Sequence, residues 1–242
     1  MSGQKQGIVD VAIIGAGLSG LALANLLNDA QLNVIVLEAQ DRIGGRIDSV
    51  TAPDGSYAAD LGPTWVWPEY QPIAKEWLRL LNVETFHQFE RGEAVIDLDK
   101  SGPARRQFLP GQHGIRRPVG GPQALINILH KRLPKGTVRT GHRVTELEMA
   151  ENGILVSFGG EEIPGFIAKR VVVAAPMRVA AETIRFPETL DQNVLSIMRA
   201  TPTWMASQAK AVAVYDRPFW RDKGLSGRVA SQWSARRSTL SA

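Results

Sequence analysis

Three glycines near the amino terminus follow the spacing G-x-G-x-x-G, in the run Gly15-Ala16-Gly17-Leu18-Ser19-Gly20. At this spacing the first glycine allows a tight turn, the second lets a pyrophosphate approach the backbone, and the third lets a helix pack closely on a strand. The free N–H groups at the start of such a helix attract an anion. Because the spacing alone often arises by chance, its meaning depends on the elements around it.

An acidic residue, Glu38, ends the next hydrophobic run. An ionised carboxylate only accepts hydrogen bonds, so Glu38 can take both hydroxyl protons of an adenosine ribose. The same charge would repel a 2′-phosphate. The expected ligand is therefore FAD or NAD rather than NADP.

A second pair of glycines follows the acid in "LEAQDRIGGR", residues 37 to 46. Gly44 and Gly45 let backbone pass close to phosphates, and Arg46 adds a permanently charged fork suited to bidentate phosphate contact. We interpret this stretch as a second clamp on the same cofactor.

The elements that must position these residues are predicted as strand, glycine turn, helix and strand. Val9 to Ile14 is short, β-branched and apolar, as is typical of a strand buried on both faces. Apolar residues repeat at helical spacing from Ser19 to about Asp29, and Asn33 to Leu37 forms a second strand. This βαβ context makes the glycine motif a strong signal, with an unliganded βαβ unit as the remaining alternative.

The rest of the chain continues the pattern of short strands and helices. Residues 101 to 122 are rich in Gly, Pro and Arg and are predicted as connection. The other predicted elements are a helix at 72–81, a strand at 93–98, a helix from 120–122 that ends before Pro134, extended chain at 138–149, a hairpin turn at Asn152-Gly153, a returning strand at 154–158, a fully buried strand at 170–175 and a final strand at 209–215. The strand at 170–175 suggests a parallel sheet resumed after a small β excursion.

Composition excludes several classes of site. The chain has no cysteine, which excludes a disulfide framework, thiolate zinc sites and a cysteine nucleophile. Because its four histidines are scattered along the sequence, we expect no metal site. The net charge of +4 comes from residues spread along the chain without a nucleic-acid-binding motif, so no nucleic-acid partner is expected. Glycines interrupt the one long apolar stretch, from Val11 to Leu27, and we expect a cytoplasmic protein without a membrane partner.

The runs "VAIIGAGLSGLALANLL" and "NVIVLEAQDRIGGR" resemble the flavin-containing amine oxidoreductases, the group of monoamine and polyamine oxidases whose wider superfamily includes protoporphyrinogen oxidase and carotenoid desaturases. The L-E-A-x-x-R-x-G-G-R signature is much more specific than the glycine motif. Further segments resemble the same family in the expected order, from about residue 8 to 230: DLGPTW (60–65), GGPQAL (120–125), HRVTELE (142–148), RVVVAAP (170–176) and KAVAVYDRPFW (210–220).

The resemblance implies a bound FAD, held non-covalently because no cysteine is present for a cysteinyl link. It implies that Gly62 to Trp65 lie along the flavin ring, that Val144 contacts adenine through its backbone, and that Pro176 ends a strand near the cofactor. The cofactor-binding residues implied are Gly15, Ala16, Gly17, Leu18, Ser19, Gly20, Glu38, Ala39, Arg42, Gly44, Gly45, Arg46, Gly62, Pro63, Thr64, Trp65, Val144 and Pro176. No catalytic side chain is identified.

The fold that the resemblance implies is α/β. It would contain a Rossmann-like FAD-binding domain of the glutathione-reductase type with a β-meander, and parts of an incomplete α+β substrate domain. Residues 1–70 and 119–200 would form the discontinuous FAD-binding domain, and residues 71–118 and 201–242 the partial substrate domain.

The reaction implied is oxidation of a C–N bond of a small-molecule amine, with oxygen as acceptor and with imine or aldehyde and hydrogen peroxide as products. Family members continue well past the YDRPFW region and contain a lysine that holds a water near the flavin; Lys210 lies in a different motif. We therefore expect a truncated member that acts as a homo-oligomer or with a complementing chain. Two alternatives stay open: a catalytically inactive dinucleotide-binding fragment or partner subunit, and a flavoenzyme like carotenoid desaturase or protoporphyrinogen oxidase.

Overall fold

The computed structural model describes residues 9–52, 54–55, 57–97, 104–109, 114–159, 163–203 and 209–231. Its helices are α1 (Leu18–Asp29), α2 (Pro72–Leu80), α3 (Gln123–Arg132), α4 (Met177–Thr183), α5 (Gln192–Ala200) and the 3-10 helix η1 (Arg221–Lys223). Its strands are β1 (Val9–Ile14), β2 (Val34–Leu37), β3 (Ser49–Thr51), β4 (Tyr57–Asp60), β5 (Thr85–His87), β6 (Glu93–Asp97), β7 (Arg105–Gln107), β8 (Arg116–Pro118), β9 (Val138–Arg139), β10 (Val144–Ala150), β11 (Gly153–Phe158), β12 (Phe166–Val173) and β13 (Leu225–Ser231).

The largest sheet has the strand order β10-β11-β12-β1-β2-β9. β1 pairs in parallel with both β2 and β12, and β2 pairs in parallel with β9. The meander β10-β11-β12 is antiparallel. The predicted βαβ unit and the predicted return to a parallel sheet after a β excursion are therefore both confirmed.

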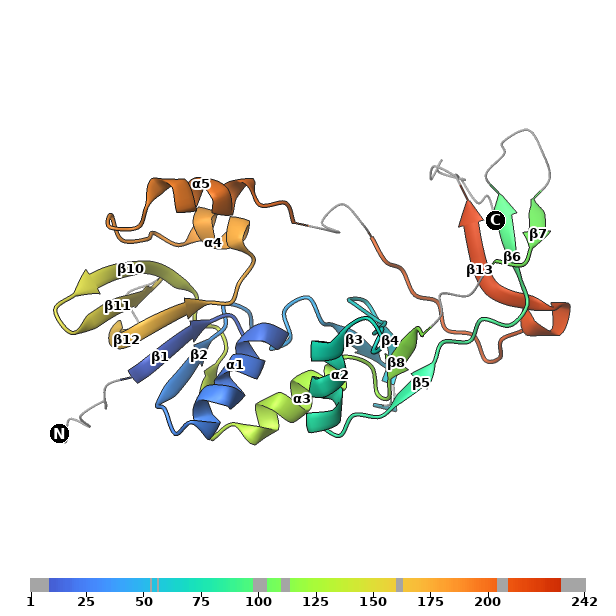
Figure 1. Ribbon diagram of the computed structural model, residues 1–242, viewed down its shortest axis with the longest axis horizontal. Coiled ribbons are helices and arrows are strands. Elements are labelled where there is room, and N and C mark those ends of the chain that lie inside the picture. The colour runs from blue at the N-terminus through green and yellow to red at the C-terminus, as the bar shows by residue number, and fades with distance from the viewer. Residues whose placement is uncertain are drawn as a thin grey trace.

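The two faces of this sheet carry different layers, because side chains alternate along a strand. Ile13 and Val36 face one side, where they pack with residues of α1 and α3 in one core cluster. Ala12 and Leu37 face the other side, in a cluster with the meander and α4. Figure 1 shows α1 and α3 below the sheet and α4 and α5 above it.

A buried asparagine joins the two helices of the first layer. Asn25 on α1 donates from Nδ2 to the carbonyl oxygens of Leu21 at 2.8 Å and of Leu129 on α3 at 2.9 Å. A buried amide that lacked these acceptors would cost free energy, so the pair of bonds fixes how α3 lies against α1. The helix that follows the glycine motif is thereby held against α3.

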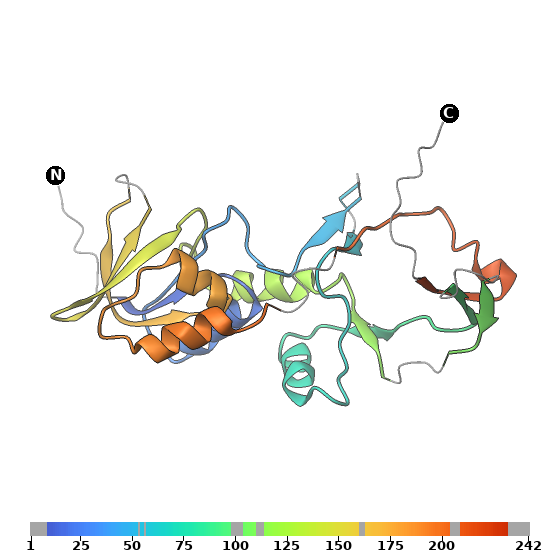
Figure 2. The same cartoon turned by 90° about the horizontal axis from the view of Figure 1, so that it is seen from above.

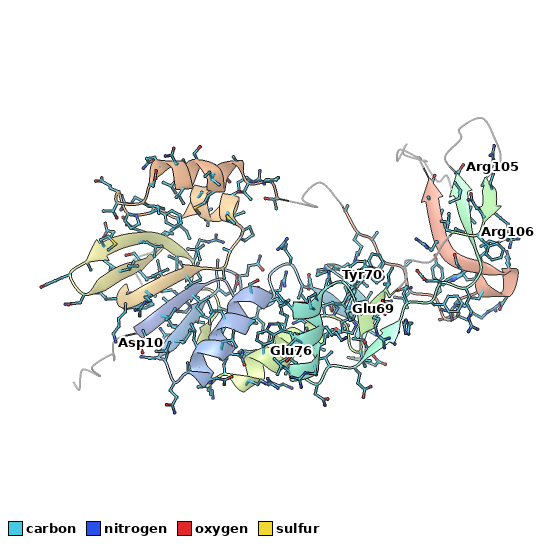
Figure 3. All side chains as sticks on the ribbon, in the orientation of Figure 1. Asp10, Glu69, Tyr70, Glu76, Arg105 and Arg106 are labelled. Atoms are coloured by element: carbon cyan, nitrogen blue, oxygen red, sulfur yellow. The ribbon has the colours of Figure 1, made fainter. Side chains whose placement is uncertain are left out.

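A three-stranded sheet, in the order β13-β6-β7, lies at the other end of the molecule (Figures 1 and 2). β13 pairs in parallel with β6, although the two strands are far apart in the sequence. Arg106 on β7 forms an ion pair with Glu93 on β6 at 2.9 Å. Figure 3 shows Arg105 and Arg106 at this end and Asp10 at the opposite end.

The region predicted as connection, 101 to 122, contains two strands that the prediction missed. β7 pairs with β6 and β8 pairs with β5, both antiparallel. These strands have only three residues each, which is too short for a recognisable alternation of apolar and polar side chains. Residues 101–103 and 110–113 of this region lie outside the described part of the chain.

The prediction that 170–175 is fully buried was wrong. In β12, Ala168 is fully buried, whereas Val172 is 36% exposed. Val172 is in register with Ile13 of β1, on the face that α1 covers. Because α1 packs over β1 and β2, it leaves the same face of β12 open to solvent.

The predicted strand at 209–215 is also wrong. Residues 209–219 form an extended segment, outside any strand of the described chain, in which every residue is exposed. Figure 2 shows this segment running towards the three-stranded sheet. Alternating apolar residues favoured a strand, but a strand also needs a neighbour with which to pair. We call residues 209–219 the connecting arm.

Two smaller points concern turns and helices. The predicted hairpin between β10 and β11 forms, but its turn lies one residue earlier than predicted: Ala150 is opposite Gly153, so that the two loop residues are Glu151 and Asn152. In the described part of the chain, every helix is too short or too polar to cross a membrane. The division into a FAD-binding and a partial substrate domain stays a prediction.

Candidate cofactor site

Gly15 and Gly20 are required by the fold itself. Gly15 donates its N–H to Leu37 O at 2.8 Å and has a φ of +110°, a conformation that favours glycine. A Cβ on Gly20 would lie 2.0 Å from Gly15 O, far inside van der Waals contact. These two glycines therefore let the turn after β1 lead directly into a helix that lies close to the strand.

Gly17 has no such internal reason to be glycine. Its backbone is extended, with φ −75° and ψ −178°, and a Cβ there would meet nothing closer than Gly44 O at 3.9 Å. Gly17 provides no side-chain cap for α1, and the first turn of that helix has no acidic residue. The start of α1 therefore presents backbone N–H groups to an acceptor from outside the chain, as a bound phosphate requires.

Glu38 lies at the carboxyl end of β2 and is 8% exposed. Its Oε2 accepts from Ala16 N at 2.8 Å, and its Oε1 accepts from Gln40 N at 3.0 Å. These two bonds fix the plane of the carboxylate, and each oxygen keeps capacity for another donor. A carboxylate held in this way fits the two hydroxyl groups of a ribose.

The loop with the second glycine pair packs against the first glycine turn. Gly44 donates its N–H to Ala16 O at 2.9 Å and forms a β-bridge with Gly17. A Cβ on Gly45 would lie 3.4 Å from Gly17 Cα, and both Gly44 and Gly45 have positive φ. The structure thus brings together the two glycine segments that the sequence analysis assigned to one clamp.

The two arginines of this loop lie differently. Arg42 folds back on its own loop, donating to Gly45 O at 3.0 Å and to Ile47 O at 3.2 Å, with Asp48 at 3.8 Å. Its guanidinium is thus engaged in holding the loop. Arg46 is exposed at the edge of the glycine segments, where its guanidinium group is accessible to an anion.

The turn at residues 62–64 rests against the same loop. Gly62 donates its N–H to Asp48 O at 3.2 Å, and a Cβ on Gly62 would lie 2.0 Å from Arg46 O. Pro63 and Trp65 are exposed, and the indole N–H of Trp65 donates to Gln88 Oε1 at 3.0 Å. The turn is thus in place beside the clamp, while Trp65 is held at the surface.

The remaining predicted residues lie around these segments. Val144 is buried at the start of β10, two residues after His142, whose N–H donates to Glu38 O at 2.8 Å. Pro176 is exposed at the start of α4, two residues after Ala174, whose carbonyl oxygen would lie 3.0 Å from a Cβ on Gly15. Leu18 and Ser19 are exposed on the first turn of α1, and Ala39 is half-buried.

A cavity of about 460 Å³ lies next to the second glycine segment and shares only Arg42 with the predicted site; its lining residues are Asp41, Arg42, Ile43, Asp48, Ser49, Gln123, His130, Val138 and Thr140. The motif glycines and Glu38 are not part of its lining. Among the described residues no group of three or more His, Asp or Glu side chains could hold a metal ion.

Two charged residues next to the 62–64 turn were given no role in the predicted site. Asp60 is buried, accepts from Ser49 Oγ at 2.8 Å and pairs with Arg117 at 3.6 Å. Lys210 of the connecting arm donates to Gly62 O at 2.6 Å and to Thr64 Oγ1 at 2.8 Å. The position of Lys210 at the start of the apolar run KAVAVY was a signal that could have suggested a role for it.

Fold and site together define the class of protein. A parallel βαβ unit, an uncapped helix start after a glycine turn, and a buried acid at the end of the second strand are the features of a dinucleotide-binding α/β protein. The family model for the NAD(P)-binding Rossmann-like domain matches residues 13–81, in agreement with this geometry.

The model for flavin containing amine oxidoreductases matches residues 97–241. The chain belongs to this flavin-containing amine oxidoreductase family. It is 48% identical over 114 residues to amine oxidase [flavin-containing] B of Sus scrofa, an alignment that covers 46% of this chain and 20% of that protein. It is 38% identical over 92 residues to the probable flavin-containing monoamine oxidase A of Dictyostelium discoideum, covering 38% of this chain and 20% of that protein. The matched region thus spans about a fifth of the length of these relatives.

Solved structures agree on the fold. A triple mutant of putrescine oxidase, redesigned in cofactor binding, superposes with a TM-score of 0.74 at 22% identity, covering 92% of this chain and 69% of that one. Cyclohexylamine oxidase from Brevibacterium oxydans IH-35A gives a TM-score of 0.74 at 18% identity, covering 93% of this chain and 70% of that one. The chain therefore has the mixed α/β fold of these oxidases, with a Rossmann-like domain.

Proposed function

We propose that the chain binds FAD non-covalently and serves as the cofactor-binding part of a flavin-dependent amine oxidase. The observation that carries the proposal is the pairing of Gly17 with Glu38. A side chain at Gly17 would meet no close neighbour in the fold, and the Glu38 carboxylate is held by Ala16 N of the glycine turn and by Gln40 N of the loop after β2. The names of the relatives, flavin-containing amine oxidases, support FAD as the dinucleotide.

The proposed reaction is oxidation of a C–N bond in a small amine. Bound FAD would accept two electrons and a proton, the equivalent of a hydride, from the carbon beside the nitrogen, and the nitrogen would release a second proton. Oxygen would then take up the two electrons and two protons to give hydrogen peroxide. Water would hydrolyse the resulting imine to an aldehyde and ammonia or an amine. In this proposal, the residues of the chain bind and orient the cofactor: the start of α1 and Arg46 hold the pyrophosphate, and Glu38 holds the ribose.

Titration of the purified protein with FAD tests this proposal. We expect the absorption bands of bound flavin and quenched flavin fluorescence. Glu38→Gln should weaken FAD binding about tenfold or more, because the amide replaces an acceptor-only group by one with a single acceptor oxygen. The same change costs about 1–3 kcal/mol of folding free energy, because Ala16 N or Gln40 N loses its acceptor.

The matched control is Glu182→Gln, at an exposed position on α4. This variant removes the same charge and should bind FAD as tightly as the wild-type chain. A protein that gains no flavin bands would overturn the proposed function, and equal binding by wild-type chain and Glu38→Gln would overturn the role of Glu38. Peroxide release with a panel of amines then tests the reaction itself.

A second candidate is an FAD-binding partner subunit that does not turn over substrate. The connecting arm favours it: Val212, Val214 and Tyr215 are exposed on an extended segment that has no paired strand in the described chain. A protein that binds FAD tightly but releases no peroxide with any amine would support this candidate over the oxidase.

A further inference from the structure

One side chain joins the connecting arm to the candidate cofactor site. Lys210 donates from Nζ to Gly62 O at 2.6 Å and to Thr64 Oγ1 at 2.8 Å, across 148 and 146 positions of sequence. Thr64 Oγ1 in turn donates to Gly62 O at 3.4 Å. The three polar groups form a closed arrangement at the 62–64 turn, which follows β4. In Figures 1 and 2 the arm passes this part of the molecule on its way to β13.

The opposite side of the same turn packs against the loop of Arg46 to Asp48. The Gly62 backbone lies so close to Arg46 O that a Cβ would approach to 2.0 Å, and Gly62 N donates to Asp48 O. A shift of the turn would therefore move the backbone of Arg46, or be blocked by it. Lys210 is thus one contact away from the loop that faces Gly17.

The ammonium group also brings a charge that its partners do not neutralise. A carbonyl oxygen and a hydroxyl oxygen are both uncharged, so the positive charge of Lys210 keeps its attraction for an anion nearby. Lys210 is exposed like the rest of the arm, yet its Nζ makes two short bonds to the turn instead of facing only water. These bonds place the charge at the turn that contacts the Arg46 loop.

We propose that Lys210 is a positioning residue, which fixes the Gly62–Thr64 turn against the Arg46 loop and adds positive charge at the edge of the cofactor site. This inference rests on the proposed function, since the anion that it serves is the FAD pyrophosphate. It also makes the connecting arm part of the site, although the arm is far from the glycine turn in the sequence.

Binding of FAD to variants of the full chain tests the inference. Lys210→Met keeps the length of the side chain but removes its donors and charge, and should raise the Kd for FAD about tenfold, as the loss of charge-assisted hydrogen bonds predicts. Lys210→Arg restores charge and donors and should recover most of the affinity. The defect of Lys210→Met should also shrink at high salt, because exposed charges are screened.

The matched control is Lys223→Met, which removes the same charge from the exposed 3-10 helix η1 and should leave FAD affinity unchanged. Thr64→Val tests the contact directly. If Lys210 acts through Thr64, the effects of Lys210→Met and Thr64→Val on the Kd should combine less than additively in a double-mutant cycle.

A measurement without FAD keeps the test independent of the proposed function. Chymotrypsin cleavage after Tyr215, an exposed residue of the arm, should be faster in Lys210→Met than in the wild-type chain or Lys223→Met, because the arm has lost its anchor. Equal cleavage and equal FAD affinity in wild-type chain and Lys210→Met would overturn the inference. A wild-type chain that binds no FAD overturns the proposed function instead, and also the part of the inference that concerns the cofactor.

Discussion

The βαβ unit and the connecting arm differ in the solvent exposure of their apolar residues. In β1 and β2, Ala12, Ile13 and Val36 have no solvent exposure, because helices or the meander cover both faces of the sheet. In the arm, Val214 is 76% exposed and every other residue from 209 to 219 is exposed as well. Both segments are apolar in sequence, so composition does not explain the contrast.

The contrast shows what a short strand needs beyond its own sequence. Two partners of β1, α1 and β2, follow within one βαβ unit, which also contains the candidate cofactor site, while its third partner, β12, lies far along the chain. The arm has no paired strand in the described chain, and the nearby β13 pairs with β6, far back in the sequence. The unit with local partners should therefore determine folding, while we propose that the arm contributes to the candidate cofactor site through Lys210.

Truncation of one apolar side chain in each region would break or confirm this contrast. Ile13→Ala should lower the free energy of unfolding by about 2–5 kcal/mol, because it leaves a cavity in a fully buried core. Val214→Ala should change it by less than about 0.5 kcal/mol, because the side chain is already in water. Urea unfolding followed by circular dichroism measures both.

The comparison of Ile13→Ala with Val214→Ala is more informative than either change in unfolding free energy alone. If Val214→Ala destabilised the chain as much as Ile13→Ala, the arm would be packed in solution against a surface that the described structure leaves open. Comparable slopes of the unfolding free energy against urea in both variants would show that the difference lies in stability and not in a changed unfolded state.

Two glycines of one motif make the next contrast, with a smaller expected effect. Gly20→Ala should destabilise the chain by about 1–3 kcal/mol, because its Cβ would overlap Gly15 O and force α1 away from the sheet. Gly17→Ala should cost less than about 1 kcal/mol, since its Cβ has room and only the helix cap is affected. Its effect should fall on FAD instead, which the new methyl group would keep from the backbone.

Thermal unfolding with and without FAD separates the two glycine variants. Gly20→Ala should have a lower Tm in both conditions. Gly17→Ala should match the wild-type chain without FAD but gain less from its addition, since a ligand stabilises only in proportion to its binding. An unchanged FAD response in Gly17→Ala would show that the pyrophosphate does not lie over Gly17.

The sequence predicted the parts of the fold whose partners are close in the chain. The strands at 9–14 and 34–37, the helix between them and the meander were all predicted from periodicity and turn residues, and all are present. β7 and β8 were missed because each has only three residues, too few for a recognisable alternation of apolar and polar side chains. The strand at 209–215 was predicted in error for the converse reason, since its pattern is clear but it has no partner in the described chain.

The candidate site shows the same limit. The glycine spacing and the acid were recognisable because one βαβ unit places Gly15, Gly17, Gly20 and Glu38 together, whatever follows. Spacing could not show that Arg42 bonds its own loop, because that depends on the direction of a flexible side chain. Nor could it place Lys210 at Gly62, because the two residues meet only through the path of the arm.

The smallest expected effect concerns the amino end of β1, where Asp10 joins three strands (Figure 3). Asp10 accepts from Lys169 Nζ at 2.7 Å and from Asn33 N at 2.9 Å. The Lys169 ammonium, followed by the Asn33 N–H, holds the pKa of the Asp10 carboxyl below its ordinary value of 3.8. The folded state therefore binds this proton less readily than the unfolded state, so the charged form adds stability above the ordinary pKa and loses it as the pH falls through the lowered pKa.

Asp10→Asn should accordingly lower the Tm slightly at neutral pH, and the difference from the wild-type chain should shrink as the pH falls below 3.8 and through the lowered pKa of Asp10. The effect should be small, because Lys169 is half exposed and water screens the pair. Glu182→Gln, at an exposed site on α4, should show no such pH-dependent difference. A Tm difference for Asp10→Asn that persisted at low pH would mean that the shape of the side chain, rather than its charge, joins β1 to its two neighbours. The stability of the βαβ unit would then owe nothing to this ion pair, and its contrast with the connecting arm would rest on apolar burial alone.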